Sequence, residues 1–168
     1  NFAVLLLAMI LMVINKFLAP QRSYAIMTLL FQNGGGEKTI RESNLLFNFI
    51  SLTILTSFIM LFSMFIQRFY LIYGGNYILH DGVDFFMDIV FVIVTMIIFN
   101  YLLTSLYSWL FKSEEMLLLH VSSVVSLMSL AVMILIPSIL LLLFYPYKFV
   151  YVITLTLLLI LFIIRLIK

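Results

Sequence analysis

The chain has 168 residues, of which 65% are hydrophobic and 10% are charged, and its mean hydropathy is +1.28. Soluble globular domains contain about 25% charged residues, and disordered chains are polar and poor in aromatic side chains, so the composition excludes both classes. The net charge of +2 is too small for a nucleic-acid-binding surface, and the absence of cysteine excludes disulfides and thiol catalysis. We therefore expect an integral membrane protein surrounded by the lipid bilayer.

Five apolar segments approach or exceed the roughly 20 residues that a helix needs to cross a bilayer. None of them shows the alternation of a β-barrel strand, so we expect an all-α fold, a polytopic transmembrane helical bundle that forms a single domain. The expected spans are about 2–18, 45–66, 85–111, 116–144 and 149–167. Because the chain opens at its first residue into an apolar run, we also expect sequence upstream, with a sixth span possible there.

The connections between these spans differ in length and character. After Pro20, the spacing of apolar residues in Tyr24–Phe31 predicts a short helix that lies in the headgroup plane. The stretch Gln67–Asp84 contains two adjacent glycines and three tyrosines, which predicts an interfacial loop. Lys112–Glu115 and Tyr145–Lys148 are short enough to be tight turns, so the last three spans should run antiparallel to their sequence neighbours.

The basic residues divide unevenly between the two sides of the predicted bundle. One side receives Lys16, Arg22, Lys38, Arg41, Lys112, Arg165 and Lys168, and the other receives Arg68 and Lys148. Because cytoplasmic loops are enriched in Lys and Arg, we expect a bacterial inner-membrane protein with a cytoplasmic C-terminus. Arg22, Lys38 and Arg41 are candidates for contacts with anionic lipid headgroups.

An acidic stripe opens the third predicted span and is the first candidate site. Asp81, Asp84 and Asp88 fall close together on one helical face, and His80 lies one turn before Asp84. Ionisable groups within spans usually face a cavity or a partner, so this stripe predicts a contact with a cation, a proton or another subunit. The alternative is that acidic residues simply favour the first turn of a helix, through its dipole.

Polar residues within the third and fourth spans predict helix packing. Asn100 lies near the middle of the third span, where an amide can form an interhelical hydrogen bond. The packing candidates of the fourth span are Ser122, Ser126, Ser129 and Pro137. Small residues four apart permit close approach of a neighbouring helix, and the proline is expected to kink the span. A proton relay through His120 is the functional alternative to packing for this span.

The segments Phe31-Gln32-Asn33 and Arg41-Glu42-Ser43-Asn44, the late span with Pro137, and the basic C-terminal end together form a recognisable pattern. In this pattern the chain resembles a family of uncharacterised multi-pass inner-membrane proteins of Bacteroidota, a domain of unknown function. The resemblance implies a membrane location and longer chains with additional N-terminal sequence. It implies no catalytic residues.

The sequence contains no metal-ligand motif, and Gly34–Thr39 lacks the spacing of a nucleotide-binding loop, so we expect no cofactor and no catalytic site. The leading hypothesis is a non-enzymatic accessory or scaffold subunit of a larger inner-membrane complex, with other membrane-protein subunits as partners. The first alternative is a small transporter or an ion- or proton-conducting component that uses Asp81, Asp84 and Asp88. A membrane enzyme acting on lipid is the weaker alternative.

Overall fold

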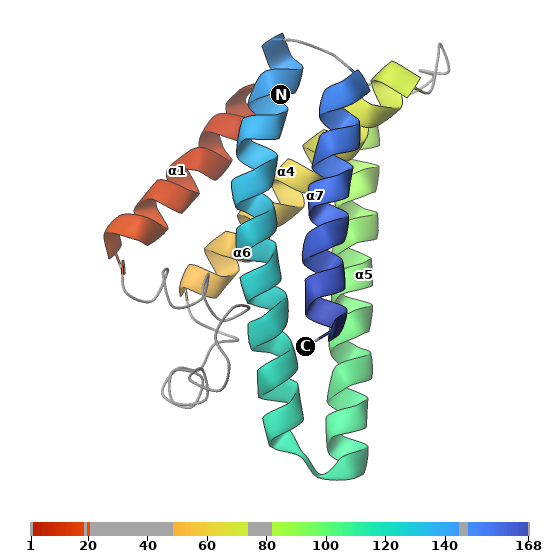
Figure 1. The fold of residues 1–168 in the computed structure, drawn as a ribbon. Coiled ribbons are helices and arrows are strands. Elements are labelled where there is room, and N and C mark those ends of the chain that lie inside the picture. The colour runs from red at the N-terminus through yellow and green to blue at the C-terminus, as the bar shows by residue number, and fades with distance from the viewer. Residues whose placement is uncertain (1, 19, 21–48, 74–81, 145–147, 168) are drawn as a thin grey trace.

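The described residues form five helices that pack against one another and alternate in direction along the chain (Figure 1). The structure, a computed structural model, describes residues 2–18, 20, 49–73, 82–144 and 148–167. Its helices are α1 (Phe2–Leu18), α4 (Phe49–Tyr73), α5 (Gly82–Phe111), α6 (Glu114–Phe144) and α7 (Lys148–Ile167). The described parts of the chain contain helices and no strands, which confirms the all-α fold class there.

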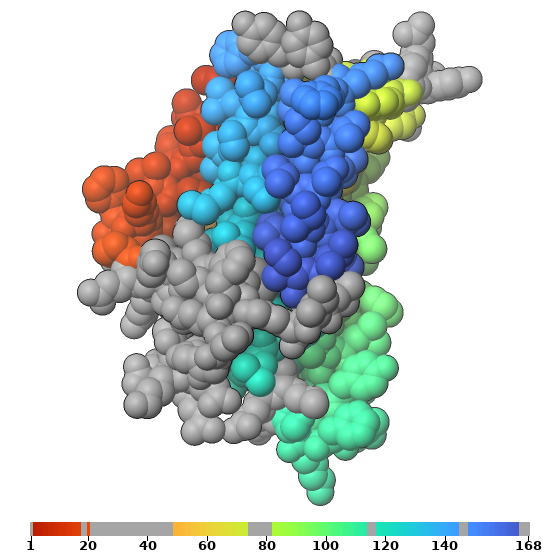
Figure 2. All heavy atoms as spheres, viewed as in Figure 1, coloured from red at the N-terminus to blue at the C-terminus, as the bar shows by residue number. Residues whose placement is uncertain are grey.

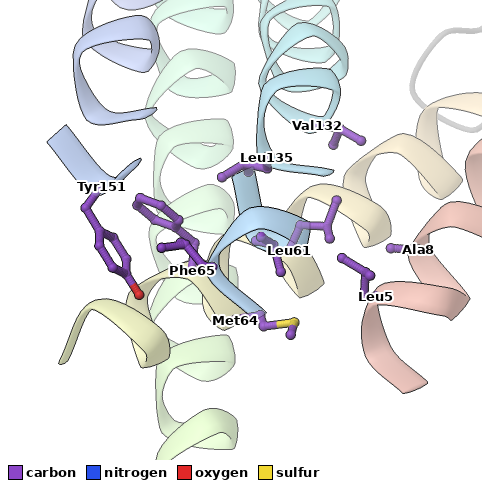
Figure 3. Packing of buried hydrophobic residues seen from close by; sticks show 10 residues of the cluster. Leu5, Ala8, Leu61, Met64, Phe65, Val132, Leu135 and Tyr151 are labelled. Carbon is purple, nitrogen blue, oxygen red and sulfur yellow. The ribbon is translucent and has the colours of Figure 1, made fainter. Parts of the chain in front are cut away.

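Helix α4 occupies the centre of the bundle and crosses it diagonally, in contact with α1, α5 and α6 (Figure 1). Its residues Leu61, Met64 and Phe65 are almost fully buried. Around them lie buried side chains of three other helices, shown in Figure 3. These neighbours are Leu5 and Ala8 of α1, Val132 and Leu135 of α6, and Tyr151 of α7. The buried residues of this core come from four helices, and the partly buried Phe86 of α5 packs against it.

The structure corrects the predicted boundary between the second span and its following loop. We predicted that the span ends near Ile66 and that Gln67–Asp84 forms a loop, whereas α4 continues to Tyr73 and α5 already begins at Gly82. No glycine or proline lies between Phe49 and Tyr73, so the helix has no local reason to stop at Gln67. The polar pair Gln67 and Arg68 consequently lies on a helix, near its end.

The tight turn predicted after the third span is present between α5 and α6. The amide of Ser113 donates to the Ser108 carbonyl (3.1 Å), and the amide of Lys112 lies 3.4 Å from the Trp109 carbonyl. With Lys112 at a φ of 53°, this is the Schellman arrangement that commonly ends a helix. The turn reverses the chain within two residues and makes α5 and α6 antiparallel neighbours.

Helix α1 is joined to α4 by a buried polar contact as well as by the apolar core. The Thr53 hydroxyl lies 2.6 Å from Oδ1 of Asn15, and both side chains are buried. In a bilayer a polar group has little water to bond with, so interhelical hydrogen bonds of this kind favour one helix pairing over others. The contact thus specifies how α1 is seated against α4.

Three of the described helical segments are long and apolar enough to cross a membrane by length and composition: Phe49–Tyr73, Gly82–Phe111 and Leu117–Phe144. Phe2–Phe17 and Lys148–Ile164 are shorter apolar helices. These findings indicate a membrane protein, while the count of five spans stays a prediction. The predicted interfacial helix Tyr24–Phe31 lies outside the described residues.

Helix α6 buries the serine face that the sequence singles out. Ser122, Ser126 and Ser129 are at most 4% exposed, whereas Pro137 is exposed and α6 continues through it as one helix. Since Ser126 is completely buried, any added volume at this position must displace a neighbour. The kink predicted at Pro137 stays a prediction.

We expect Ser126→Leu to destabilise the bundle and Ser126→Ala to leave it nearly unchanged. Overpacking a buried position costs about 1–3 kcal/mol, whereas alanine retains the small surface. The measurement is the thermal unfolding midpoint of each purified variant in the same detergent. Equal midpoints for the two variants would show that this face meets lipid rather than another helix.

Candidate functional site

Asp84 and Asp88 are the two members of the predicted acidic stripe that the structure describes, and both are exposed on α5. Asp84 lies in the first turn, and Asp88 follows one turn later on the same face. The other two candidates, His80 and Asp81, lie outside the described residues. The two described carboxylates therefore face the surroundings of the bundle and not its core.

The opposite face of α5 holds the helix to the bundle. Ile89 and Ile93 are buried, and at 100° per residue they point about 140–180° away from Asp84. The acidic face continues into exposed apolar side chains, among them Val83, Met87 and Phe91, which are 70%, 60% and 72% exposed. Two carboxylates thus stand on an apolar surface that no described element covers.

Asn100 and His120 connect α5 with α6 farther along the same pair of helices. Oδ1 of Asn100 lies 3.2 Å from Nε2 of His120, which acts as the donor in the tautomer with a proton on Nε2. Asn100 points about 160° away from Asp84, so it is not part of the acidic face. The contact is an interhelical hydrogen bond of the kind that we predicted for Asn100.

Sequence reasoning missed a polar and aromatic cluster where α4 ends and α7 begins, at the top of Figure 1. Gln67 is 3% exposed and donates from Nε2 to the Gly82 carbonyl (2.5 Å), which joins α4 to the start of α5. Tyr151 of α7 is completely buried against Phe65 and Phe69. The uninterrupted helical sequence up to Tyr73 was the signal that places Gln67 and Arg68 in the bundle.

The remaining candidates divide into buried and undescribed residues. Ser126 and Ser129 have hydroxyl groups without a hydrogen-bond partner, and Ser122 donates to the Leu119 carbonyl (2.9 Å). The headgroup candidates Arg22, Lys38 and Arg41 lie outside the described residues. Among the residues that the structure describes, no group of three or more His, Cys, Asp or Glu side chains is placed to hold a metal ion.

Comparison of the chain with curated proteins and with solved structures finds no match. A family model described as a domain of unknown function, DUF4271, matches residues 1–168. This match confirms the resemblance to a family of unknown function, while an origin in Bacteroidota stays a prediction. Because the family model covers the whole chain, the chain belongs to the DUF4271 family.

Proposed function

We propose that this chain is a non-enzymatic accessory or scaffold subunit of a larger inner-membrane complex and that it docks through α5. The observation that carries the proposal is how little of this helix is buried against the rest of the bundle. Of its 30 residues, Ile89, Ile93 and Ser108 are the buried ones, whereas the 25-residue α4 has ten buried residues. Figure 2 shows the later part of α5 and its turn extending beyond the end of α7.

Exposure to lipid alone would be unfavourable for the acidic side of α5. Asp88 lies six residues after Gly82, which places it roughly 9 Å along the helix axis. An ionised carboxylate facing hydrocarbon is costly, and such groups within spans usually pair with another charge. A basic side chain of a neighbouring subunit would neutralise Asp88 while apolar residues of the same subunit cover Met87 and Phe91.

The rival hypothesis is a transporter or an ion-conducting component that uses the acidic stripe. In this fold, a path along Asp84 and Asp88 would run over the outer surface of α5 and would need a second subunit to enclose it. The docking role needs the same surface without a conducting path, so we favour it. The third hypothesis, a membrane enzyme acting on lipid, gains no support from the described residues.

The arrangement of the helix ends also supports the proposed orientation. The end of α1, the α5–α6 turn and the C-terminal end of α7 lie toward the lower part of Figure 1, and the sequence places Lys16 in the last turn of α1 and Lys112 in the α5–α6 turn. The end of α4 and the start of α7 lie toward the upper end of Figure 1, and the sequence places Arg68 near the end of α4 and Lys148 at the start of α7. The positive-inside rule then favours a cytoplasmic lower end in the inner membrane.

We expect a C-terminal fluorescent-protein fusion to be bright in bacterial cells and a C-terminal alkaline phosphatase fusion to be inactive. Green fluorescent protein becomes fluorescent when it folds in the cytoplasm, whereas alkaline phosphatase needs the oxidising periplasm to form its disulfides. Whole-cell fluorescence and phosphatase activity, normalised to the amount of fusion protein, are the measurements. The reverse pattern would place the C-terminus outside and reject this orientation.

We expect Asp88→Asn to reduce recovery of the complex at least tenfold while the stability of the isolated chain stays unchanged. Breaking a buried ion pair by removing one partner costs about 3–5 kcal/mol, and the exposed Asp88 contributes little to the fold of this chain alone. Asp84→Asn is the matched control, because it lies one turn nearer the start of the helix, where water screens it. It should have a much smaller effect.

The measurements are blue-native electrophoresis of mild-detergent extracts and ion flux in liposomes containing the purified chain. Normal assembly of Asp88→Asn with loss of an ion flux that the unmodified chain supports would favour the transporter. Normal assembly and function of both variants would mean that the carboxylates are only a preference of the helix start.

A further inference from the structure

The last two turns of α5 present large apolar and aromatic side chains on the outside of the bundle. Tyr107, Trp109, Leu110 and Phe111 are between 59% and 76% exposed, and we term the surface that they form the α5 tip. Figure 2 shows this end of α5 beyond the end of α7. Along the helix axis the α5 tip begins roughly 28 Å from Asp88, so it is separate from the proposed docking face.

The opposite end of the bundle has the chemistry of a membrane interface. Nζ of Lys148 lies 5.3 Å from the centre of the exposed Tyr73 ring. The ring centre of Tyr70 lies 4.9 Å from that of Phe85, near the start of α5. Tyrosine and basic side chains are enriched where the hydrocarbon of a bilayer meets the headgroups. Phe85 therefore marks the level of one headgroup layer on α5.

The length of α5 places the α5 tip at the other face of a bilayer. At 1.5 Å per residue, Trp109 lies roughly 36 Å from Phe85 along the helix axis. A bilayer contains about 30 Å of hydrocarbon and is about 40–45 Å thick with its headgroups. A helix tilt of about 20°, which is usual in membranes, shortens the span only to about 34 Å. Trp109 thus falls beyond the hydrocarbon and within the opposite headgroup layer.

Helix α7 is shorter, which explains why α5 extends beyond it. From Lys148 to Ile167 the helix measures roughly 28 Å, close to the thickness of the hydrocarbon alone. A helix that starts at the same headgroup layer and has this length ends near the far boundary of the hydrocarbon. The additional length of α5 therefore corresponds to the depth of a headgroup layer.

The turn that follows the α5 tip suits a headgroup layer, because its polar groups bond to one another. The Ser113 amide donates to the Ser108 carbonyl (3.1 Å), and the Ser108 hydroxyl donates to the Ser113 carbonyl (2.9 Å). Residues 89–111 contain no charged side chain, and Lys112 in the turn is the first one after them. A charge at this position reaches water, while the side chains before it remain apolar.

We propose that the α5 tip binds a lipid surface, with the rings of Tyr107 and Trp109 seated among the headgroups of one leaflet. Both rings combine an apolar body with a polar N–H or O–H group, which is the chemistry that this layer favours. At 100° per residue, the side chains of the α5 tip spread over about 200° of the helix circumference. Lipid surrounds a helix on all its free sides, whereas a soluble protein docks on one. Lipid is therefore the occupant that fits this surface.

The test uses the fluorescence of Trp109, which is the single tryptophan of the chain and needs no substitution. The full chain is purified and reconstituted into phosphatidylcholine vesicles whose acyl chains carry bromine either near the headgroup or near the chain end. Acrylamide, present on both sides of the vesicle membrane, is the water-soluble quencher. We expect the largest loss of fluorescence with the shallow bromine and a small loss with acrylamide.

The matched control combines Trp109→Phe with Met96→Trp. Met96 is also exposed on α5, 68% of its surface, but lies about 20 Å before Trp109 along the helix axis, near the middle of the bilayer. Its tryptophan should lose most fluorescence with the deep bromine. Because the unmodified chain carries the main measurement, the proposal does not depend on the folding of this variant.

Shallow bromine as the strongest quencher of Trp109, with deep bromine strongest in the control, would support the proposal. Strong quenching by acrylamide alone would overturn it and would mean that the α5 tip projects into water, where a soluble protein could dock. Quenching by neither agent would overturn it in favour of a covering protein surface, such as a second copy of the chain. Deep bromine as the strongest quencher of Trp109 would place the α5 tip in hydrocarbon and also reject the headgroup site. None of these outcomes depends on the docking proposal for Asp88, since the vesicles contain no other protein.

Discussion

The packing of α4 against α1 and α6 is the interaction on which the rest of the bundle depends. Hydrocarbon provides no hydrophobic force between helices, so their association relies on close contact and on interhelical polar bonds. Leu61, Met64 and Phe65 provide the close contact, and Thr53 provides the polar bond through Asn15. Small side chains on the same helix, such as the fully buried Ser57, allow neighbouring helices to approach. Helix α4 thus organises elements that are distant from it in sequence.

This central position has consequences for the exposed face of α5 and for the end of the bundle near Tyr151. Because α4 is covered by α1 and α6, α5 meets the bundle mainly through one edge and leaves its acidic and apolar surface exposed. Helix α4 also places Arg68 near the end of the bundle, where Tyr151 of α7 packs against Phe65 and Phe69 of α4. The exposed face of α5, where we propose docking, and the aromatic contacts of Tyr151 are therefore two products of one packing arrangement.

Much of the helical architecture could be predicted from local sequence, because backbone groups in a bilayer must be satisfied within each helix. Long apolar runs predicted helices such as α6, and the short polar segment at Lys112 predicted a turn; the structure contains both. The end of α4 was predicted too early because Gln67 and Arg68 are polar, and polarity alone does not stop a helix. Helical periodicity predicted that Asp84 and Asp88 of the acidic stripe share one face of a helix. It could not predict that this face points away from the bundle.

The sequence by itself determined that the chain is helical, that its segments suit a membrane and that its charges favour one orientation. These properties depend on composition, periodicity and position along the chain. The tertiary structure alone decided which faces are covered, since burial depends on neighbours that are distant in sequence. It placed Ile89 rather than Asp84 against the bundle and seated Tyr151 beside Phe65. It also buried Nε of Arg68 without an acceptor, because the packing of α4 with its neighbours, and not the local sequence, sets the depth of that side chain.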